Sequence, residues 1–247
     1  MTRKHFFIVG AQRSATTYLS NILDAHPQIE MAFPPKPEPK FFLEEGSEHR
    51  VDQYLSKYFG RKNAPLVYGE KSTSYIESKL AAERIKKAFP DALIIINLRN
   101  PVHRAISNYW FSASNGIEDQ SISVLVDESA QKRPYNNNLS VTPFDYLRRG
   151  CYIEYIDNYA EVFPPEQIKL VVQDQLVGKI DSVQDLYKWL GVDTSFVPAC
   201  LEEKINSAGY SEDKVPSDVI TFLNRYFEEP NKQLQEKYGV EIACWKA

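Results

Sequence analysis

Two short segments of this 247-residue sequence combine arginine with hydroxyl-bearing side chains. The first runs from Arg13 to Thr17, and the second carries Arg99 and, eight residues later, Ser107. Arginine presents N–H donors in a planar fork that matches phosphate or sulfate oxygens, and each hydroxyl group adds a donor. Because eight residues are about two helical turns, Arg99 and Ser107 can face one ligand if a helix follows Arg99. The sequence therefore predicts two anion-binding segments, with Arg104 in the second pointing to solvent.

The segment from Gly10 to Thr17 stands between an apolar run and a helical pattern, where phosphate-binding loops lie. Compared with the nucleotide-binding pattern G-x-x-x-x-G-K-[ST], Ala15 replaces the second glycine and Thr16 replaces the lysine. The missing lysine disfavours a nucleoside triphosphatase, although a P-loop kinase stays an alternative. The loop can still hold one phosphate through backbone N–H and hydroxyl groups, with Arg13 supplying positive charge. An ordinary strand-to-helix turn is the structural alternative.

Alternating strand and helix patterns indicate the elements that would position both segments. Apolar runs predict strands, and apolar residues at spacings of three and four predict helices. Asn100 and Pro101 suit the cap and first position of a helix. We therefore predict an α/β fold, a single P-loop-like domain over residues 1–247 with a central parallel sheet flanked by helices. The predicted strands are Phe6–Val9, Leu66–Tyr68, Leu93–Leu98 and Ile168–Val172. Two predicted helices begin at Thr17 and at Pro101. The other predicted helices cover 75–89 and about 144–163, 181–190 and 216–237.

Two further stretches predict long loops. Residues 33–39 are rich in proline, and residues 131–143 are polar with three consecutive asparagines. Parallel sheets bind ligands beyond the carboxyl ends of their strands, so loops placed there would form walls or lids of a substrate site. Simple surface insertions are the equal alternative.

Composition and charge exclude several kinds of partner. The chain has 33 Asp and Glu against 29 Lys and Arg, and its net charge of -4 gives no general attraction for nucleic acid. The apolar runs are far shorter than the roughly 20 residues of a membrane-spanning helix. Three scattered cysteines favour a reducing, cytoplasmic compartment over a disulfide framework. The four histidines are isolated, so we expect no metal site, and nothing in the sequence indicates an oligomeric state.

Four segments together resemble the sulfotransferases that use 3′-phosphoadenosine-5′-phosphosulfate (PAPS), particularly their bacterial and heparan-sulfate branch. The family loop R/K-S/G-G-T-T is similar to residues 13–17, and the family pattern L-R-x-P-x-x-R-x-x-S-x-Y matches residues 98–109. The pattern E-K-S/T-x-x-Y is similar to residues 70–75, and R-G-x-Y is similar to residues 149–152. The resemblance spans most of residues 6–190.

This resemblance implies sulfuryl transfer from PAPS to an acceptor hydroxyl, which leaves adenosine 3′,5′-bisphosphate (PAP) and requires no metal. It implies that Arg99 and Ser107 hold the 3′-phosphate. It also implies that Glu70, at the carboxyl end of a predicted strand, is the general base and that Lys71 contacts the base or the sulfonate. A basic loop with Lys204 would close over the nucleotide. The residues expected to hold the 5′-phosphosulfate are Arg13, Ser14, Ala15, Thr16 and Thr17.

Two departures from the family patterns affect these expectations. Ala15 stands where the family loop has glycine, and a left-handed backbone there would cost on the order of 1 kcal/mol. The family element K-E-P-x-F-F appears as residues 37–42 with proline in place of lysine, and we assign it no role. We expect a carbohydrate acceptor ahead of a lipid or small metabolite. The alternatives are a catalytically silent nucleotide- or glycan-binding protein of the same fold and, for Glu70, a structural ion pair.

Overall fold

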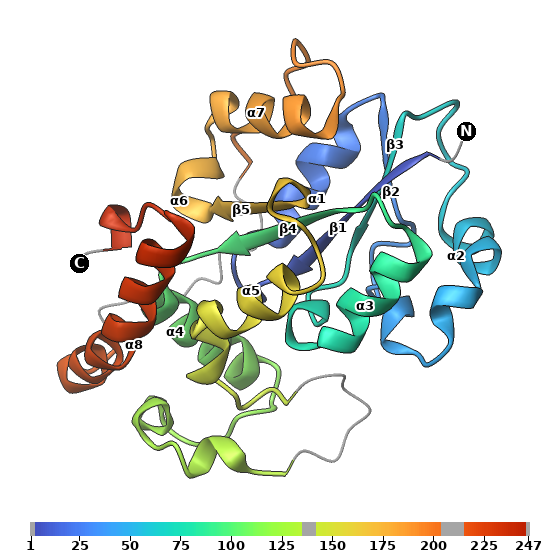
Figure 1. The fold of residues 1–247 in the computed structure, drawn as a ribbon. Coiled ribbons are helices and arrows are strands. Elements are labelled where there is room, and N and C mark those ends of the chain that lie inside the picture. The colour runs from blue at the N-terminus through green and yellow to red at the C-terminus, as the bar shows by residue number, and fades with distance from the viewer. Residues whose placement is uncertain (1–2, 135–141, 204–214, 246–247) are drawn as a thin grey trace.

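The computed structural model describes residues 3–134, 142–203 and 215–245, and one sheet forms its centre (Figure 1). Every neighbouring pair of strands runs parallel, in the order β2-β3-β1-β4-β5. The predicted α/β fold with a parallel sheet flanked by helices is therefore confirmed. The strands are β1 (Lys4–Gly10), β2 (Ile29–Met31), β3 (Val67–Lys71), β4 (Leu93–Leu98) and β5 (Ile168–Val172).

Helices connect these strands and largely follow the predicted pattern. The first residues of the predicted helix over 75–89 form a separate 3₁₀ turn, after which Ser78 caps the next helix by accepting the N–H of Ala81. None of the helices in the described ranges is long and apolar enough to cross a membrane. The helices are α1 (Thr16–Ala25), α2 (Val51–Tyr58), α3 (Lys79–Ala88), α4 (Pro101–Ser114), α5 (Tyr152–Ala160), α6 (Gln173–Leu176), α7 (Ile180–Leu190) and α8 (Ser217–Tyr238).

The predicted helix over 144–163 is wrong in its first half. Only a 3₁₀ turn at Arg148–Gly150 precedes α5 in that stretch of the described chain. A Cβ atom at Gly150 would lie 2.5 Å from the Phe227 ring, so a glycine is needed where α8 approaches. A glycine weakens a helix interior, and here it separates the turn from α5. The predicted loop at 33–39 has no regular structure, whereas residues 135–141 of the other predicted loop lie outside the described residues.

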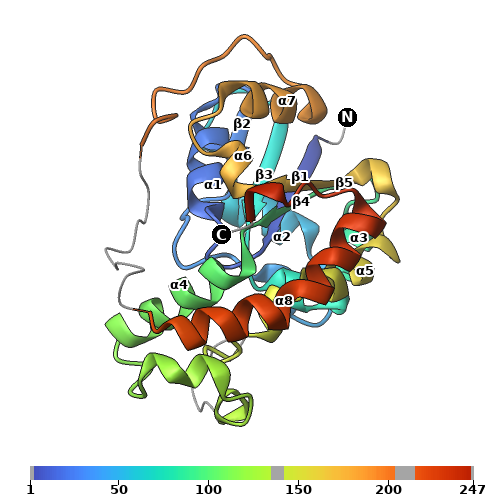
Figure 2. The same cartoon turned by 90° about the vertical axis from the view of Figure 1, so that its left-hand side faces the viewer.

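Helices cover both faces of the sheet, as its apolar strands require. Successive side chains of a strand point to opposite faces, so Phe6 and Ile8 of β1 pack with α1 and α7. Phe7 and Val9 pack with α3 and α5 on the other face. Figure 2 shows α1, α6 and α7 on one side of the strands and α3 and α5 on the other.

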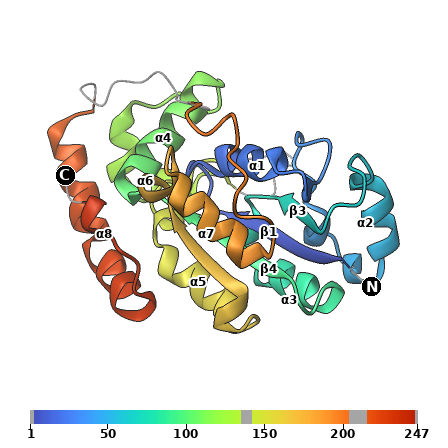
Figure 3. The ribbon, with the colours of Figure 1, turned by 90° about the horizontal axis from the view of Figure 1, so that it is seen from above.

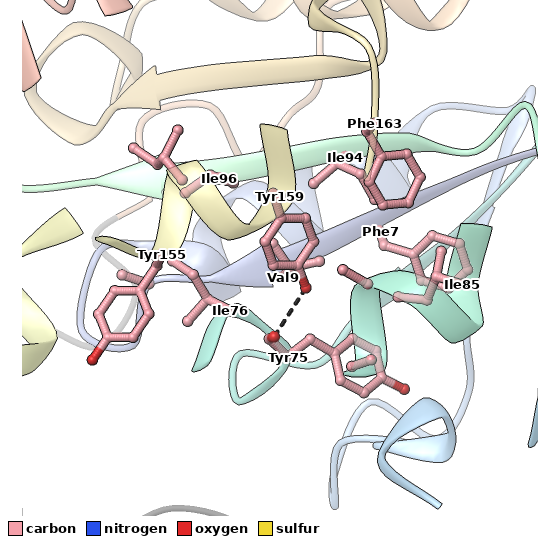
Figure 4. Packing of buried hydrophobic residues seen from close by; sticks show 14 of the residues in the cluster. Phe7, Val9, Tyr75, Ile76, Ile85, Ile94, Ile96, Tyr155, Tyr159 and Phe163 are labelled. Atoms are coloured by element: carbon pink, nitrogen blue, oxygen red, sulfur yellow. Dashed lines mark hydrogen bonds between the residues drawn. The ribbon is translucent and has the colours of Figure 1, made fainter. Parts of the chain in front are cut away.

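The face that α3 and α5 cover is rich in buried aromatic rings (Figure 4). Tyr159 of α5 donates a hydrogen bond of 2.9 Å from its hydroxyl to the carbonyl of Tyr75. Both rings are fully buried, and Phe7 and Phe163 belong to the same cluster. The segment that follows β3 is therefore held to α5 at Tyr75.

The strand order reverses its direction at β1. The chain passes from β1 to β2 and β3 on one side, and then to β4 and β5 on the other side of β1. Ligands of open parallel sheets bind where the connections diverge in this way. The strands point towards the end of the molecule where α4 and α8 lie, away from α2 (Figures 1 and 3).

Candidate active site

The loop between β1 and α1 has a backbone conformation that suits an anion. Arg13 has φ 68° and Ala15 has φ 57°, so two non-glycine residues occupy the left-handed region. Ala15 directly precedes α1, and an alanine side chain has no acceptor that could cap the first N–H groups of the helix. Those N–H groups and the positive end of the helix dipole are left for a ligand. The positive φ that we considered for position 15 is confirmed.

Asn97 of β4 fixes this loop from the neighbouring strand. Its carbonyl accepts the N–H of Ala11 at 2.8 Å, and its side-chain Nδ2 donates to the carbonyl of Ser14 at 3.0 Å. Asn97 is fully buried, so these hydrogen bonds are shielded from water. Asn97 is not among the site residues predicted from the sequence. The signal was available, because an asparagine interrupts an otherwise apolar strand and a buried amide needs partners.

The two predicted anion-binding segments meet at the carboxyl edge of the sheet. Arg13 Nε donates to Ser107 Oγ at 3.2 Å, and Arg99 Nη1 donates to the carbonyl of Arg13 at 3.2 Å. The Arg13 guanidinium also lies over the ring of Phe111, with Cζ 4.7 Å from the ring centroid. Two guanidinium groups and a hydroxyl are therefore close together in the fold.

The start of α4 places Ser107 in this cluster. The Asn100 side chain accepts the N–H of Val102 at 2.9 Å and caps the helix, and Pro101 occupies its first turn as predicted. The expectation that Arg104 points to solvent is wrong. Arg104 is fully buried and donates to the carbonyl of Tyr146, and its burial lowers the pKa of its guanidinium. It therefore belongs to the interior between α4 and the following segment.

The segment that resembles R-G-x-Y contacts both anion-binding segments, the loop after β1 and the end of β4. Tyr152 donates from its hydroxyl to the carbonyl of Arg99 at 2.9 Å. Arg149 donates to the side chain of Gln12 at 3.3 Å and forms an ion pair of 2.9 Å with Glu77. The Arg149 side chain is 4% exposed, so these contacts are shielded from water.

A carboxylate from the proline-rich loop reaches the end of β3. Glu38 Oε1 forms an ion pair of 2.5 Å with Lys71 Nζ, and Glu38 Oε2 accepts the N–H of Thr73 at 2.8 Å. The hydroxyl of Thr73 donates to the same oxygen at 3.0 Å. The Glu38 side chain is 18% exposed, so it stays accessible to a substrate. Glu38 is not among the site residues predicted from the sequence, although it is the glutamate of the K-E-P-x-F-F resemblance.

Glu70 lies beneath this ion pair and not at an open surface. Neighbouring residues of a strand point to opposite faces, so Lys71 reaches Glu38 while Glu70 turns into the aromatic cluster. Glu70 is 1% exposed, and its Oε1 accepts the hydroxyl of Ser72 at 2.6 Å. Burial raises the pKa of Glu70 to about 7, against the opposing effect of the hydroxyl groups around it. This burial is not what we expected of a group that takes a proton from a substrate.

Comparison with known proteins identifies the family. A sequence profile described as the sulfotransferase domain matches residues 3–214. The chain belongs to the sulfotransferase domain family. Human bifunctional heparan sulfate N-deacetylase/N-sulfotransferase 3 is 27% identical to it over 272 residues, which cover 97% of this chain and 31% of that relative. Mouse heparan sulfate glucosamine 3-O-sulfotransferase 6 is 26% identical over 264 residues, which cover 95% of this chain and 72% of that relative.

Solved sulfotransferase structures share the fold of this domain. A sulfotransferase from Alicyclobacillus acidocaldarius superimposes with a TM-score of 0.80 and 27% identity, and the match covers 100% of both chains. A mouse sulfotransferase complexed with PAP superimposes with a TM-score of 0.53 and 14% identity, covering 96% of this chain and 86% of that one. The second likeness shows the fold alone. The suspected family and the P-loop-like fold are therefore confirmed.

The remaining predicted residues of the sulfotransferase site have different surroundings. Ser14 and Thr16 are buried in the loop, and Thr17 is partly buried. Lys204 lies outside the described residues. His26 is fully buried at the end of α1 and contacts the carbonyl of Asp193 at 2.9 Å, so its role is structural. Within residues 3–134, 142–203 and 215–245, no three His, Cys, Asp or Glu side chains gather in a way that could hold a metal ion.

Proposed function

We propose that the chain transfers a sulfuryl group from PAPS to a hydroxyl group of a carbohydrate. The observation that carries this proposal is the meeting of Arg13, Arg99 and Ser107 beside the start of α1. Membership in the sulfotransferase domain family supports the same donor. The chain spans about a third of the bifunctional relative's length, so the proposal concerns the activity of this segment alone.

The hydrogen-bond donors of the cluster fit a nucleotide with phosphate groups at the 3′ and 5′ positions of its ribose. In this proposal Arg13 and the loop over 14–17 bind the 5′-phosphosulfate, while Arg99 and Ser107 bind the 3′-phosphate. PAPS, when bound, supplies the group that is transferred. Arginine keeps its proton at neutral pH, so Arg13 stabilises negative charge and does not act as an acid. Its contacts with Ser107 and Phe111 hold the guanidinium in place before a ligand arrives.

We assign the general base to Glu38 and keep Glu70, the base predicted from the sequence, as the alternative. Glu38 is accessible, and Lys71 and Thr73 hold its two oxygens in one orientation. Its carboxylate takes the proton of the acceptor hydroxyl, which frees that oxygen to form the new bond. Lys71, 2.5 Å from the carboxylate, supplies positive charge next to the reacting groups. The expected closure of the loop with Lys204 over the nucleotide stays a prediction.

The names of the relatives support the proposed acceptor class. Both of those described above carry heparan sulfate in their names, one as an N-sulfotransferase and the other as a 3-O-sulfotransferase. We therefore propose a carbohydrate ahead of a lipid or a small metabolite, and we propose no nucleic-acid partner because the net charge is -4. Cys151, Cys200 and Cys244 are free thiols, which supports the proposed cytoplasmic location.

Calorimetric titration of the chain with PAP and with ATP, without metal, tests the proposed sulfuryl donor. We expect PAP to bind far more tightly than ATP, because the cluster offers cationic donors to two separate phosphate groups. Tighter binding of ATP in the presence of magnesium would overturn the proposal in favour of a kinase. A screen with labelled PAPS and hydroxyl- and amine-bearing glycans, lipids and small alcohols then identifies the acceptor, and PAP binding without transfer to any of them would indicate a silent binding protein.

A further inference from the structure

Three consecutive residues at the end of β3 form polar contacts with the segment that carries Glu38. Lys71 and Thr73 contact the Glu38 carboxylate, and between them the Ser72 hydroxyl oxygen accepts the N–H of Lys40 at 2.9 Å. Ser72 is itself tied to the sheet, because its N–H donates to the carbonyl of Ile8 at 3.1 Å. Residues 38–40 are thereby docked onto β1 and β3.

The hydrogen bond to Lys40 needs one orientation of the Ser72 hydroxyl. A serine hydroxyl has one proton and two lone pairs, so it must direct its proton away from Lys40 in order to accept that N–H. Ser72 is fully buried, and the acceptor that takes its proton is Glu70 Oε1, 2.6 Å away. Lys40 itself has φ 51°, a backbone conformation that persists where the surroundings hold it.

This chain of contacts explains a buried carboxylate that a substrate does not reach. Burying a carboxylate is unfavourable unless it is hydrogen-bonded or paired, and Glu70 accepts the hydroxyl of Ser72. We propose that Glu70 is a positioning residue, which orients the Ser72 hydroxyl and through it fixes Lys40 and the attached Glu38. The inference rests on the proposed role of Glu38 as the base and extends it by naming what holds the base in place.

The arrangement requires that Oε1 of Glu70 carries no proton. A carboxyl protonated on Oε1 would donate to Ser72 Oγ, and the serine proton would then lose its acceptor. The groups that face this carboxyl are Tyr54 of α2, Tyr75, Tyr159 of α5, and Glu38. Burial and, to a smaller degree, the charge of Glu38 raise the pKa of Glu70 to about 7. We therefore expect the base to be held firmly above this pH and less firmly below it.

Hydrogen exchange of the Lys40 amide tests the contact without relying on catalysis. In Ser72→Ala and in Glu70→Leu at pH 8, we expect this amide to exchange about tenfold faster than in the wild type, because the first variant removes its acceptor and the second removes the acceptor that orients the Ser72 hydroxyl. Glu30→Leu is the matched control. Glu30 is a fully buried glutamate of β2 that accepts the backbone N–H groups of the loop at 60–61, and its loss should leave Lys40 exchange unchanged.

Turnover measurements on the full chain test the consequence for the reaction. Both variants should lose about 10-fold to 100-fold in kcat, the range expected when a reacting group is displaced by about 1 Å, while PAP affinity stays the same. Ser72→Thr keeps the hydroxyl and should retain most of the activity. In a Glu38→Gln background, adding Glu70→Leu should cause no further loss, because its effect passes through Glu38. The rise of wild-type kcat around pH 7 should be absent in Glu70→Gln.

Several results would overturn the inference. Unchanged exchange of Lys40 in both variants would do so whether or not the chain is active. A further fall in kcat when Glu70→Leu is added to Glu38→Gln would also do so, because Glu70 would then act apart from Glu38. A wild-type chain that neither binds PAP nor transfers the sulfuryl group would instead overturn the proposed function, and the exchange measurement would still decide whether Glu70 holds the segment.

Discussion

Arg13 and Ser107, 94 positions apart in the sequence, are joined by a hydrogen bond of 3.2 Å from Nε to Oγ. They meet because β1 and β4 are neighbours in the sheet, so the loop after β1 and the helix after β4 start from one edge. The regions proposed to bind the 5′ and 3′ ends of the nucleotide are therefore in direct contact. A substitution in one region is expected to change ligand binding by the other.

Arg99→Ala should separate recognition of the 3′-phosphate from recognition of the rest of the nucleotide. A hydrogen bond from a charged donor contributes about 1.5–3 kcal/mol, so PAP affinity should fall by roughly 10-fold to 100-fold while adenosine 5′-phosphate affinity changes little. Calorimetry with both nucleotides measures this. Arg148→Ala is the control, because that side chain is 68% exposed and pairs with Glu154. An equal loss for both nucleotides would remove the 3′-phosphate role of Arg99.

Glu38→Gln should abolish most turnover and leave PAP binding intact. Glutamine preserves the size of the side chain and can still accept from Thr73, but it has no carboxylate to take a proton. Loss of a general base typically lowers the rate by about 10² to 10⁴. Steady-state transfer and PAP calorimetry on the same preparation give the two readouts. Full transfer by Glu38→Gln, together with a loss of this size in Glu70→Gln, would return the base to Glu70.

Glu70→Gln should change how stability depends on pH. The pKa of Glu70 is raised from 4.5 to about 7 in the folded protein, so the folded state keeps this proton to higher pH than the unfolded state. Its contribution to stability is therefore present below the unfolded pKa and is lost as pH rises through the folded pKa. Glutamine cannot ionise, so the variant should gain up to roughly 3 kcal/mol relative to the wild type over this range. Urea unfolding at several pH values checks this, and parallel curves would contradict it.

Ala15→Gly should stabilise the chain. Ala15 has φ 57°, and relief of a left-handed alanine is worth up to about 1 kcal/mol in the free energy of unfolding. Ala64→Gly is the matched control, because Ala64 has φ 53° and is exposed outside the nucleotide loop. Urea unfolding should give similar gains for both, and PAP affinity should change only for Ala15→Gly. A loss of stability at both positions would show that chain entropy outweighs the strain.

The sequence predicts those parts of the fold that depend on local patterns. β4 and β5 have the predicted bounds, because apolar residues predominate in both strands. β3 extends past the predicted Leu66–Tyr68 through Glu70 and Lys71, which are charged but buried. The partners that make their burial tolerable, Ser72 and Glu38, come from the next turn and from a distant loop, so no local pattern shows them. β2 and α2 are absent from the prediction because they are short.

The candidate site divides in the same way. Arg13, Arg99 and Ser107 could be predicted to gather because each follows a strand of a parallel sheet, and such ends meet at one edge. It could not be predicted that Glu38, and not Glu70, is the accessible carboxylate. Only the folded chain shows which carboxylate faces outward, since the proline-rich loop has no periodic pattern that fixes its path.

The stacking of Arg13 on Phe111 has an evolutionary consequence. A guanidinium is planar and can donate to Ser107 along its edge while its face lies on the ring, whereas a lysine ammonium has no such face. Phe111 is 45% exposed, and without the arginine above it a polar residue would suit that position on α4 better. We therefore expect the two positions to change together. Among relatives of this chain we expect an aromatic residue at position 111 to accompany arginine at position 13 and to be lost in lineages where lysine replaces it.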